Sequence, residues 1–223
     1  MAAVQKLEQK KSQRYTYAEY CEWDDDERWE LIDGVPYAMA APTRMHQGIS
    51  RNIVFQIHQF LRGKTCEVLI PRQKFALQTF ATPLERGIAA PRFANDLIGA
   101  AIYYAPFDVR LNADTFDNTV VQPDIVVYCD ESKLSDKGGV GAPDMAVEIL
   151  SPSSASHDMI RKYMLYMKAG VREYWIIDPT IKSLVVHILE DGTYRGRGFE
   201  QNDVVPISVL EGCEVNLAEV FEE

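Results

Sequence analysis

The spacing of hydrophobic and polar residues in the N-terminal third of the chain predicts a helix, a hairpin and a second, longer helix. The segment TYAE has the residue types and spacing of a capping box, which favours a short helix over residues 17–22. Two apolar runs then flank Asp33-Gly34, a dipeptide typical of hairpin turns because glycine adopts positive φ without strain. Isoleucines recur at helical spacing over residues 49–61, so we expect a helix that ends near Gly63.

The rest of the chain consists mainly of short apolar runs that predict β-strands. One further helix is expected between residues 156 and 169, and Gly170 stands where its C-terminal cap belongs. The glycine-rich segment 132–143 is typical of a loop. The expected apolar stripe of the helix comprises Ile160, Tyr163, Met164 and Met167. Strands are expected at residues 66–70, 74–79, 102–111, 119–130, 143–150, 173–179 and 183–190.

Together these elements predict an α/β fold in which a mixed β-sheet is flanked by α-helices. The length of 223 residues suits one domain. We expect residues 1–13, which are polar and basic, to be a flexible arm, and residues 14–223 to form a single domain. Residues 70–101 lack a clear period over much of their length, and we interpret them as an insertion or a long loop.

Composition narrows the classes of function. The formal net charge is −10. Proteins that bind nucleic acid over a whole face are usually basic. Contact of this chain with DNA must therefore be confined to a local basic patch or depend on a metal ion. The chain has no run of about 18 apolar residues and begins without an apolar signal segment, so we expect neither membrane insertion nor secretion. Four scattered cysteines without a CxxC pair are expected to be free thiols in a reducing cytoplasm.

One carboxylate stands in an unusual position. Glu148 lies in the middle of the apolar run PDMAVEIL, which is typical of a short buried strand ended by Ser151-Pro152. An ionised carboxylate in such a strand loses solvation worth several kcal/mol unless a cation meets it. Glu148 therefore either faces water or has a positively charged partner.

Asp124 offers one way to supply that partner. It follows Pro123 at the start of the neighbouring apolar run IVVYC, and consecutive strands are adjacent in space more often than not. The carboxylates of Asp124 and Glu148 can then point to one face and hold a cation between them. Magnesium suits such a place, because it takes oxygen ligands and needs only one or two carboxylates besides water and substrate phosphates. Asp124 can equally be an ordinary turn residue.

Lys162 is the third member of this group, because it lies on the next predicted helix and can reach back over the end of the Glu148 strand. Asp158 shares its helix face at i, i+4 spacing. The alternatives are that Asp158 and Lys162 form a surface ion pair and that Glu148 faces solvent on an edge strand. Two carboxylates and a lysine recur in one strand–strand–helix unit, so from the residues alone the metal site and these alternatives both stay open.

Several motifs occur in a recognisable order: WELIDG, a single His46 before a helix, APFDVRL, VVQPDIVV, GAPDMAVEILSPSS, the spaced Asp158 and Lys162, and AGVREYWIIDP. Together they resemble the Uma family of bacterial restriction endonucleases, which is placed in the PD-(D/E)XK nuclease superfamily. The resemblance covers residues 16–221. It implies a restriction-endonuclease-like fold and the cleavage of phosphodiester bonds with one or two magnesium ions.

The resemblance also implies roles for individual residues. Asp124 matches the PD motif and would be a metal ligand, as would Glu148, and the backbone carbonyl of Ile149 would supply a further ligand. The lysine of the superfamily normally follows the second acid by two residues, but that position is Leu150 here. The resemblance therefore points to Lys162 on the following helix.

Glu30 and His46 fall on recurrent positions of the same family. Glu30 resembles the extra acid that some such nucleases contribute from the N-terminal part of the chain, and His46 would contact a phosphate or assist proton transfer. A histidine near a helix N-terminus can also simply be satisfied by local hydrogen bonds. The segment 70–101 is longer than the family implies.

The resulting hypothesis is a magnesium-dependent endonuclease that hydrolyses DNA, in which manganese can substitute and Lys162 steadies the attacking water or the transition state. The resemblance also implies a homodimer, because nucleases that cut both strands often pair. The alternative is a non-catalytic nucleic-acid-binding or regulatory module on a nuclease fold, which the acidic net charge favours. A two-carboxylate glycosidase fits the nearby lysine poorly, and the chain has no GxSxG motif for a serine nucleophile.

Overall fold

Two β-sheets, a small ribbon and four α-helices make up the described part of the computed structural model. The structure describes residues 13–24, 27–62, 67–71, 102–105, 107–113, 115–151 and 157–222. The helices are α2 (Tyr17–Tyr20), α3 (Arg44–Leu61), α4 (His157–Ala169) and α5 (Leu217–Val220), with a 3-10 turn, η1, at Glu131–Lys133. The strands are β1 (Trp29–Ile32), β2 (Val35–Ala38), β3 (Glu67–Pro71), β4 (Ile102–Ala105), β5 (Asp108–Arg110), β6 (Val120–Val121), β7 (Ile125–Tyr128), β8 (Leu134–Ser135), β9 (Gly138–Val140), β10 (Met145–Ile149), β11 (Glu173–Asp178), β12 (Ser183–Glu190), β13 (Thr193–Glu200), β14 (Val204–Pro206) and β15 (Glu214–Asn216).

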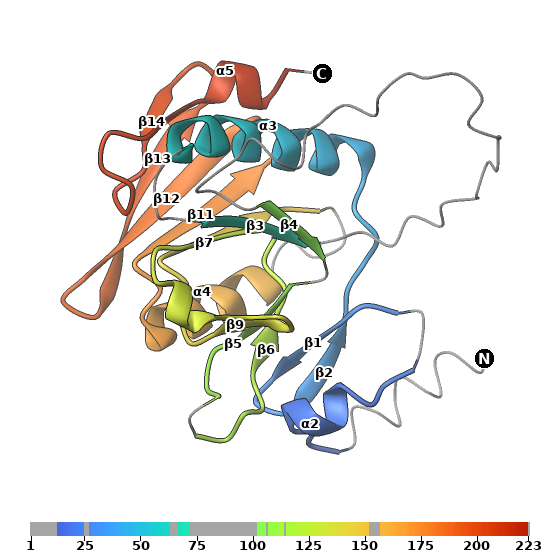
Figure 1. Cartoon of the computed structure of the whole chain (residues 1–223). Helices are drawn as coiled ribbons and strands as arrows, with labels where there is room; N and C mark the ends of the chain where they lie inside the picture. The colour runs from blue at the N-terminus through green and yellow to red at the C-terminus, as the bar shows by residue number, and fades with distance from the viewer. Residues whose placement is uncertain are drawn as a thin grey trace, which may run out of the picture.

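The larger sheet has the strand order β13-β12-β11-β10-β7-β3-β4, and the smaller one has the order β2-β1-β6-β5-β9-β8. The larger sheet is mixed, because β10 runs parallel to β11 and β3 runs parallel to β4, whereas β7 is antiparallel to both β10 and β3. Helices α3 and α5 lie on one side of this sheet (Figure 1). Helix α4 and the smaller sheet pack against its other side.

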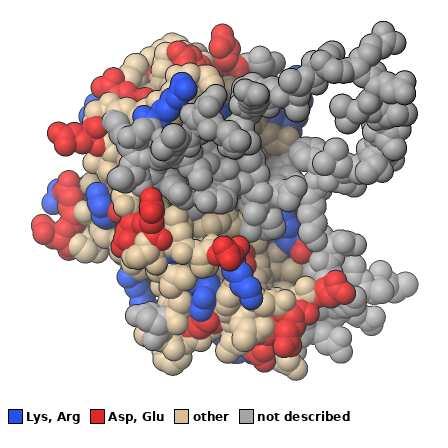
Figure 2. Space-filling model, in the orientation of Figure 1, with Lys and Arg blue, Asp and Glu red and all other residues tan. Residues whose placement is uncertain are grey.

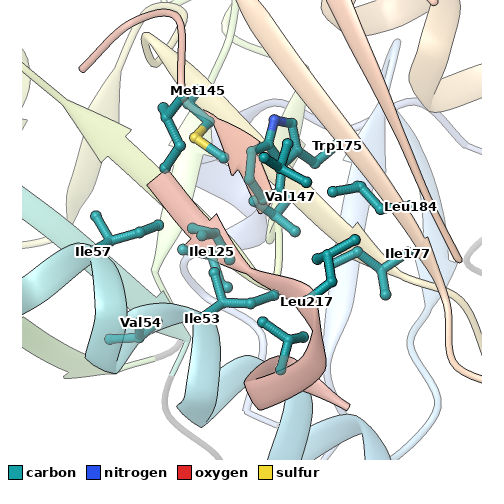
Figure 3. Packing of buried hydrophobic residues seen from close by; sticks show 14 of the residues in the cluster. Ile53, Val54, Ile57, Ile125, Met145, Val147, Trp175, Ile177, Leu184 and Leu217 are labelled. Carbon is teal, nitrogen blue, oxygen red and sulfur yellow. The ribbon is translucent and has the colours of Figure 1, made fainter. Parts of the chain in front are cut away.

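The main apolar core lies between the larger sheet and helices α3 and α5. Ile53 and Ile57 of α3 meet Val147 of β10 and Trp175 of β11 there (Figure 3). All four side chains are fully buried, and burial of one such side chain stabilises a fold by about 1.5–3 kcal/mol. Because side chains alternate along a strand, the residues between these core positions, including Glu148, point to the side of the sheet that α4 covers.

Two predicted strands are each divided between the two sheets, which corrects the sequence-based expectation. The run 102–111 forms β4 in the larger sheet and β5 in the smaller one, and the run 119–130 forms β6 and β7 in the same way. Pro123 lies between β6 and β7, where a residue without an N–H group removes no ladder hydrogen bond. Asp124 therefore stands where the chain crosses from one sheet to the other.

The predicted loop 132–143 is also corrected, because it contains β8 and β9. A β-carbon on Gly138 would clash with the carbonyl oxygen of Asp108, and one on Gly139 would clash with the hydroxyl of Tyr128. Glycine is therefore required where β9 packs so closely against its neighbours. The glycines that suggested a loop serve this close packing instead.

The short helix and the hairpin are confirmed. Thr16 and Glu19 form both hydrogen bonds of the capping box at the start of α2. Asp33 and Gly34 join β1 to β2 with φ of 51° and 77°. The N-terminal residues 1–12, Gly63, the expected strand 74–79 and most of the segment 70–101 lie outside the described residues.

The expected stripe of helix α4 is wrong in part. Ile160 and Met164 are 68% and 52% exposed, whereas Lys162 is only 8% exposed and Tyr166 is fully buried. The helix therefore turns a lysine and a tyrosine, not two of its apolar residues, toward the sheet.

Other expectations from composition can be compared with the described residues. Cys21, Cys129 and Cys213 form no disulfide bond within the described part of the chain, as expected, and Cys66 lies outside the described residues. No helix in the described part of the chain is long and apolar enough to cross a membrane. On the face drawn in Figure 2, acidic and basic side chains are interspersed and form no broad basic surface among the described residues.

Candidate active site

A cavity of about 280 Å³ lies at the end of β10, and both sheets and helices α3 and α4 contribute to it. Its acidic and basic lining residues are Arg28, Glu30, His46, Asp124, Glu148, Arg161 and Lys162. Polar groups from distant parts of the sequence thus converge on one concave space, as is typical of catalytic and binding sites.

Asp124 is held in place by its neighbours on both sides. Its backbone N–H donates to the carbonyl of Val147 (3.1 Å), and its Oδ2 accepts the backbone N–H of Ile149 (2.8 Å). Nε2 of His46 lies 3.1 Å from the same Oδ2 atom. These contacts lock the start of β7 to the end of β10 and fix the orientation of the carboxylate.

His46 lies in the first turn of α3, where Thr43 caps the helix by accepting the backbone N–H of His46. Burial by itself would lower the pKa of His46. The hydrogen bond to Asp124 and the negative charges of Asp124 and Glu148 outweigh burial, so the pKa lies above its ordinary value. The other ring nitrogen, Nδ1, is buried without a hydrogen-bond partner among the described residues.

Glu148 has the positively charged partner that its position demands. Its Oε1 accepts hydrogen bonds from Nζ of Lys162 (2.9 Å) and from the hydroxyl of Tyr166 (2.7 Å). Burial raises the pKa of Glu148, and the negative charges of Asp124 and Glu30 raise it further. Lys162 lowers it, and the result is a pKa of about 7. Strand β10 lies between β7 and β11, so the alternative that Glu148 faces solvent on an edge strand is wrong.

Lys162 bridges two carboxylates that lie far apart in the sequence. Its Nζ is 2.8 Å from Oε1 of Glu30 and 2.9 Å from Oε1 of Glu148. Burial lowers the pKa of Lys162, but the two negative charges and their hydrogen bonds more than compensate, so the pKa is raised and the amine stays protonated. Because Lys162 is buried, the alternative that it belongs to a surface ion pair is wrong.

Glu30 is buried in β1 and is fixed independently of the lysine. Its Oε1 accepts the backbone N–H of Gln122 at 2.8 Å. The side chain of Gln122 in turn accepts two hydrogen bonds from Arg28, at 3.0 and 3.2 Å. The smaller sheet thus places the carboxylate of Glu30 beside Lys162 of α4, in addition to the carboxylate of Glu148.

The carboxylates leave room for a cation. Three carboxylates, Asp124, Glu148 and Glu30, line the cavity, and Lys162 pairs with Glu30 and Glu148 but not with Asp124. Within the described residues, Oδ1 of Asp124 and Oε2 of Glu148 accept no hydrogen bond, because all contacts of these side chains go to the other oxygen. Each carboxylate therefore keeps one oxygen for a ligand.

The donor set fits a hard, oxygen-binding ion. No group of three or more histidine, cysteine, aspartate or glutamate side chains in the described part of the chain is arranged to hold a metal. Asp124 and Glu148 would therefore act with the backbone carbonyl of Ile149 and with water. Magnesium accepts such a set, whereas structural zinc sites need four protein ligands.

Of the residues singled out from the sequence, Asp124, Glu148, Ile149, Lys162, Glu30 and His46 all line the cavity. Asp158 lies in the first turn of α4, and its side chain is outside the described part of the structure. Sequence reasoning missed Tyr166, whose hydroxyl holds Glu148. Tyr166 is four residues after Lys162, so it lies on the same helix face, and this spacing is the signal that could have identified it.

A protein-family model covers most of the chain. The model of the Uma2 family, described as "Putative restriction endonuclease", matches residues 17–91 and 92–218. The chain therefore belongs to this family.

Two individual proteins illustrate the relationship. An uncharacterized protein of Synechocystis sp. PCC 6803 is 22% identical over 189 residues, which cover 83% of this chain and 80% of the relative. A crystal structure from Anabaena variabilis ATCC 29413, described as "a putative nuclease belonging to DUF820", superimposes with a TM-score of 0.64 at 17% identity, over 93% of this chain and 97% of the other. The expected fold, a mixed sheet flanked by helices as in a nuclease, is thereby confirmed.

Proposed function

We propose that this protein is a magnesium-dependent endonuclease that hydrolyses phosphodiester bonds of DNA, with manganese able to replace magnesium. The observation that carries the proposal is the convergence of Asp124, Glu148 and a buried Lys162 on one cavity. Each of the two carboxylates has one oxygen engaged by the protein and one oxygen that accepts no hydrogen bond from the part of the chain that the structure describes. Membership in a family described as restriction endonucleases supports the same reaction class.

The bound metal would lower the pKa of a water molecule and neutralise charge that grows on the phosphate. Asp124 and Glu148 would hold it, with the carbonyl of Ile149. The contacts of Asp124 with His46 and with the Ile149 N–H orient its carboxylate in advance, so little reorganisation is needed on binding.

Lys162 would act on the substrate through its remaining hydrogen-bond donor. An ammonium group has three N–H donors, and Lys162 directs two of them to Glu30 and Glu148. The third would meet the attacking water or a phosphate oxygen. Because the pKa of Lys162 is raised, the positive charge persists at neutral and mildly alkaline pH.

Tyr166, Glu30 and His46 would act as positioning residues. Tyr166 fixes Oε1 of Glu148, and Glu30 keeps the ammonium of Lys162 at the cavity wall. His46 fixes Asp124 and holds a proton at Nε2 when it is charged.

The direct test is cleavage of supercoiled plasmid by purified protein with Mg²⁺, with Mn²⁺ and with EDTA. We expect nicking or linearisation with either metal and none with EDTA. Asp124→Asn and Glu148→Gln should lose at least about 100-fold in rate, since each removes a metal ligand. Arg195→Gln, on the exposed surface, is the matched control and should cut normally. If the wild-type protein cuts no more than Asp124→Asn with any divalent ion, the enzyme proposal fails.

One observation favours a second candidate, a non-catalytic binding module. The net charge is −10, and the face in Figure 2 shows no broad basic surface among the described residues. Calorimetric titration with Mn²⁺ separates the two candidates: binding that disappears in Glu148→Gln supports the nuclease, and no binding by the wild type supports the module. Cleavage of both strands would require two sites, so we also propose a homodimer, which light scattering can detect.

A further inference from the structure

A second and larger cavity, of about 570 Å³, lies between the N-terminal half of α3 and the turn that joins β11 to β12. Three cations, Arg44, Arg51 and Lys182, line it, and Glu222 is its one carboxylate among the described residues. Apolar groups such as Met45 complete the wall. The cavity thus carries an excess of positive charge in a chain that is acidic overall.

These three cations differ from four others in the structure. Arg110, Arg172, Arg195 and Lys162 each form an ion pair with a carboxylate. Arg44, Arg51 and Lys182 are exposed, and none of them forms an ion pair with a residue that the structure describes. Their charges are therefore available to an anionic ligand.

Arg51 is held in position by its neighbour. Its Nε and Nη2 donate to Oδ1 of Asn52 at 3.1 and 3.0 Å. The amide nitrogen of Asn52 donates to the carbonyls of Glu219, Val220 and Glu222, which ties α3 to the end of α5. The guanidinium is thus fixed at the rim of the cavity, which reduces the entropy lost when it binds a ligand.

The second cavity and the candidate active site lie at the same edge of the larger sheet. Strands β10 and β11 are parallel, and Glu148 pairs with Ile176 in register, so both strands end at this edge. The turn after β11, which carries Lys182, is therefore near the active-site end of β10. Arg44 comes two residues before His46, which contacts Asp124. The first turn of α3 thus separates the two cavities.

We infer that the second cavity holds the sugar–phosphate backbone of the DNA strand next to the phosphate that is cleaved. This inference rests on the proposed function and specifies where the DNA substrate of the nuclease is bound. A DNA strand repeats its anionic groups and presents apolar sugar surface between them, which matches a cavity with a cationic rim and a partly apolar wall. The cavity is too large for a single small anion. It also supplies the local basic patch that an acidic DNA-binding protein requires.

Gly48 provides a way to block the cavity without changing its charge. A β-carbon added at Gly48 would have no atom within 4 Å, so the position faces open space in the cavity wall. Gly48→Leu should therefore place a side chain where the strand would lie while leaving the packing of α3 intact. Gly48→Ala, which adds one methyl group, is its matched control.

The experiment measures binding of the full-length protein to a fluorescein-labelled DNA duplex by anisotropy. EDTA prevents cleavage, and salt is varied between about 50 and 200 mM. A plot of log affinity against log salt has a negative slope. In the double variant Arg44→Gln/Lys182→Gln this slope should be less steep by about 1.8, or roughly 0.9 for each lost phosphate contact. Gly48→Leu should weaken binding at least tenfold with the charges unchanged. Arg195→Gln, near the other end of β12, should bind like the wild type.

Each outcome of this experiment is decisive. A double variant with the wild-type affinity and salt slope overturns the inference, as does a wild-type protein that binds no duplex at the lowest salt. If the wild type cuts DNA but neither variant affects binding, only this inference fails. If the variants weaken binding but the wild type never cuts, the DNA-binding cavity stands and the nuclease proposal fails.

Discussion

Replacing Lys162 by methionine should destabilise the protein strongly, because it leaves two carboxylates without their shared cation. The ammonium lies 2.8 Å from Glu30 and 2.9 Å from Glu148, and Lys162 is only 8% exposed. Methionine fills most of the volume of the aliphatic stem, so the change removes the charge with little loss of packing. The variant therefore isolates the electrostatic role of the lysine.

The expected magnitude follows from burial. Removing one partner of a buried ion pair costs about 3–5 kcal/mol, which is a large share of the 5–15 kcal/mol that stabilises a typical protein. The matched control is Arg195→Met, whose ion pair with Glu190 is exposed, with side chains 75% and 52% accessible. Breaking that pair should cost at most about 1 kcal/mol.

The loss should also depend on pH. The pKa of Glu148 is raised to about 7, above the value of 4.5 that we take for the unfolded chain, so the folded state favours the protonated acid. This contribution to stability is fully present below pH 4.5 and is lost as the pH rises through 7. Without Lys162, which lowers the pKa of Glu148, the pKa should rise further. The defect of Lys162→Met should therefore be smaller at pH 5 than at pH 8.

Urea denaturation followed by tryptophan fluorescence at pH 5 and pH 8 measures both effects. A loss at pH 8 no greater than that of Arg195→Met would refute the reasoning. So would an equal loss at the two pH values, because the carboxylate repulsion would then play no part. The double variant Lys162→Met/Glu148→Gln should recover part of the stability, since only one carboxylate remains to be charged.

Three further predictions concern metal binding, hydrogen bonding and the helix. Glu148 must lose a proton to bind a metal ion, and its pKa is about 7. The affinity for Mn²⁺, measured by calorimetry, should therefore increase by up to tenfold for each unit that the pH is raised toward 7, and should be constant above pH 7. An affinity that does not change with pH would contradict this role. Tyr166→Phe removes the 2.7 Å hydrogen bond to Glu148 and should cost about 1.5–3 kcal/mol in urea denaturation at pH 8, and no loss would mean that the bond contributes nothing. Gly48→Ala adds a methyl group in open space within α3 and should stabilise the protein by about 0.8–1 kcal/mol, or 2–4 °C in Tm by scanning calorimetry; a lower Tm would show that the glycine is required.

The charged centre of the site could be predicted from the sequence because local rules apply to it. A glutamate within a buried strand requires a cation, and the structure supplies Lys162 from the helix that follows that strand. Alternation along the strand and the adjacency of consecutive strands were sufficient to bring Asp124 beside it. The contact of Lys162 with Glu30 lies beyond such rules, because it joins elements far apart in the sequence.

Two features could not be predicted because only tertiary packing decides them. The β-branched run 119–130 indicates strand, but nothing local specifies that β6 joins one sheet and β7 the other. Hydrophobic periodicity assigned Ile160 and Met164 to the buried face of α4, yet both are exposed. The face that turns inward carries Lys162 and Tyr166, which donate hydrogen bonds to Glu148. Leaving that buried carboxylate without hydrogen bonds would cost more free energy than burying two further apolar side chains would gain.

The central claim is that Asp124 and Glu148 share a divalent cation, and anomalous diffraction from crystals soaked in Mn²⁺ tests it most directly. We expect one strong anomalous peak in the cavity, within bonding distance of both carboxylates, on the side of Oδ1 of Asp124 and Oε2 of Glu148, and no peak in crystals of Glu148→Gln. A well-ordered site that stays without a peak at saturating Mn²⁺, or a peak bound only by residues elsewhere, would contradict the account.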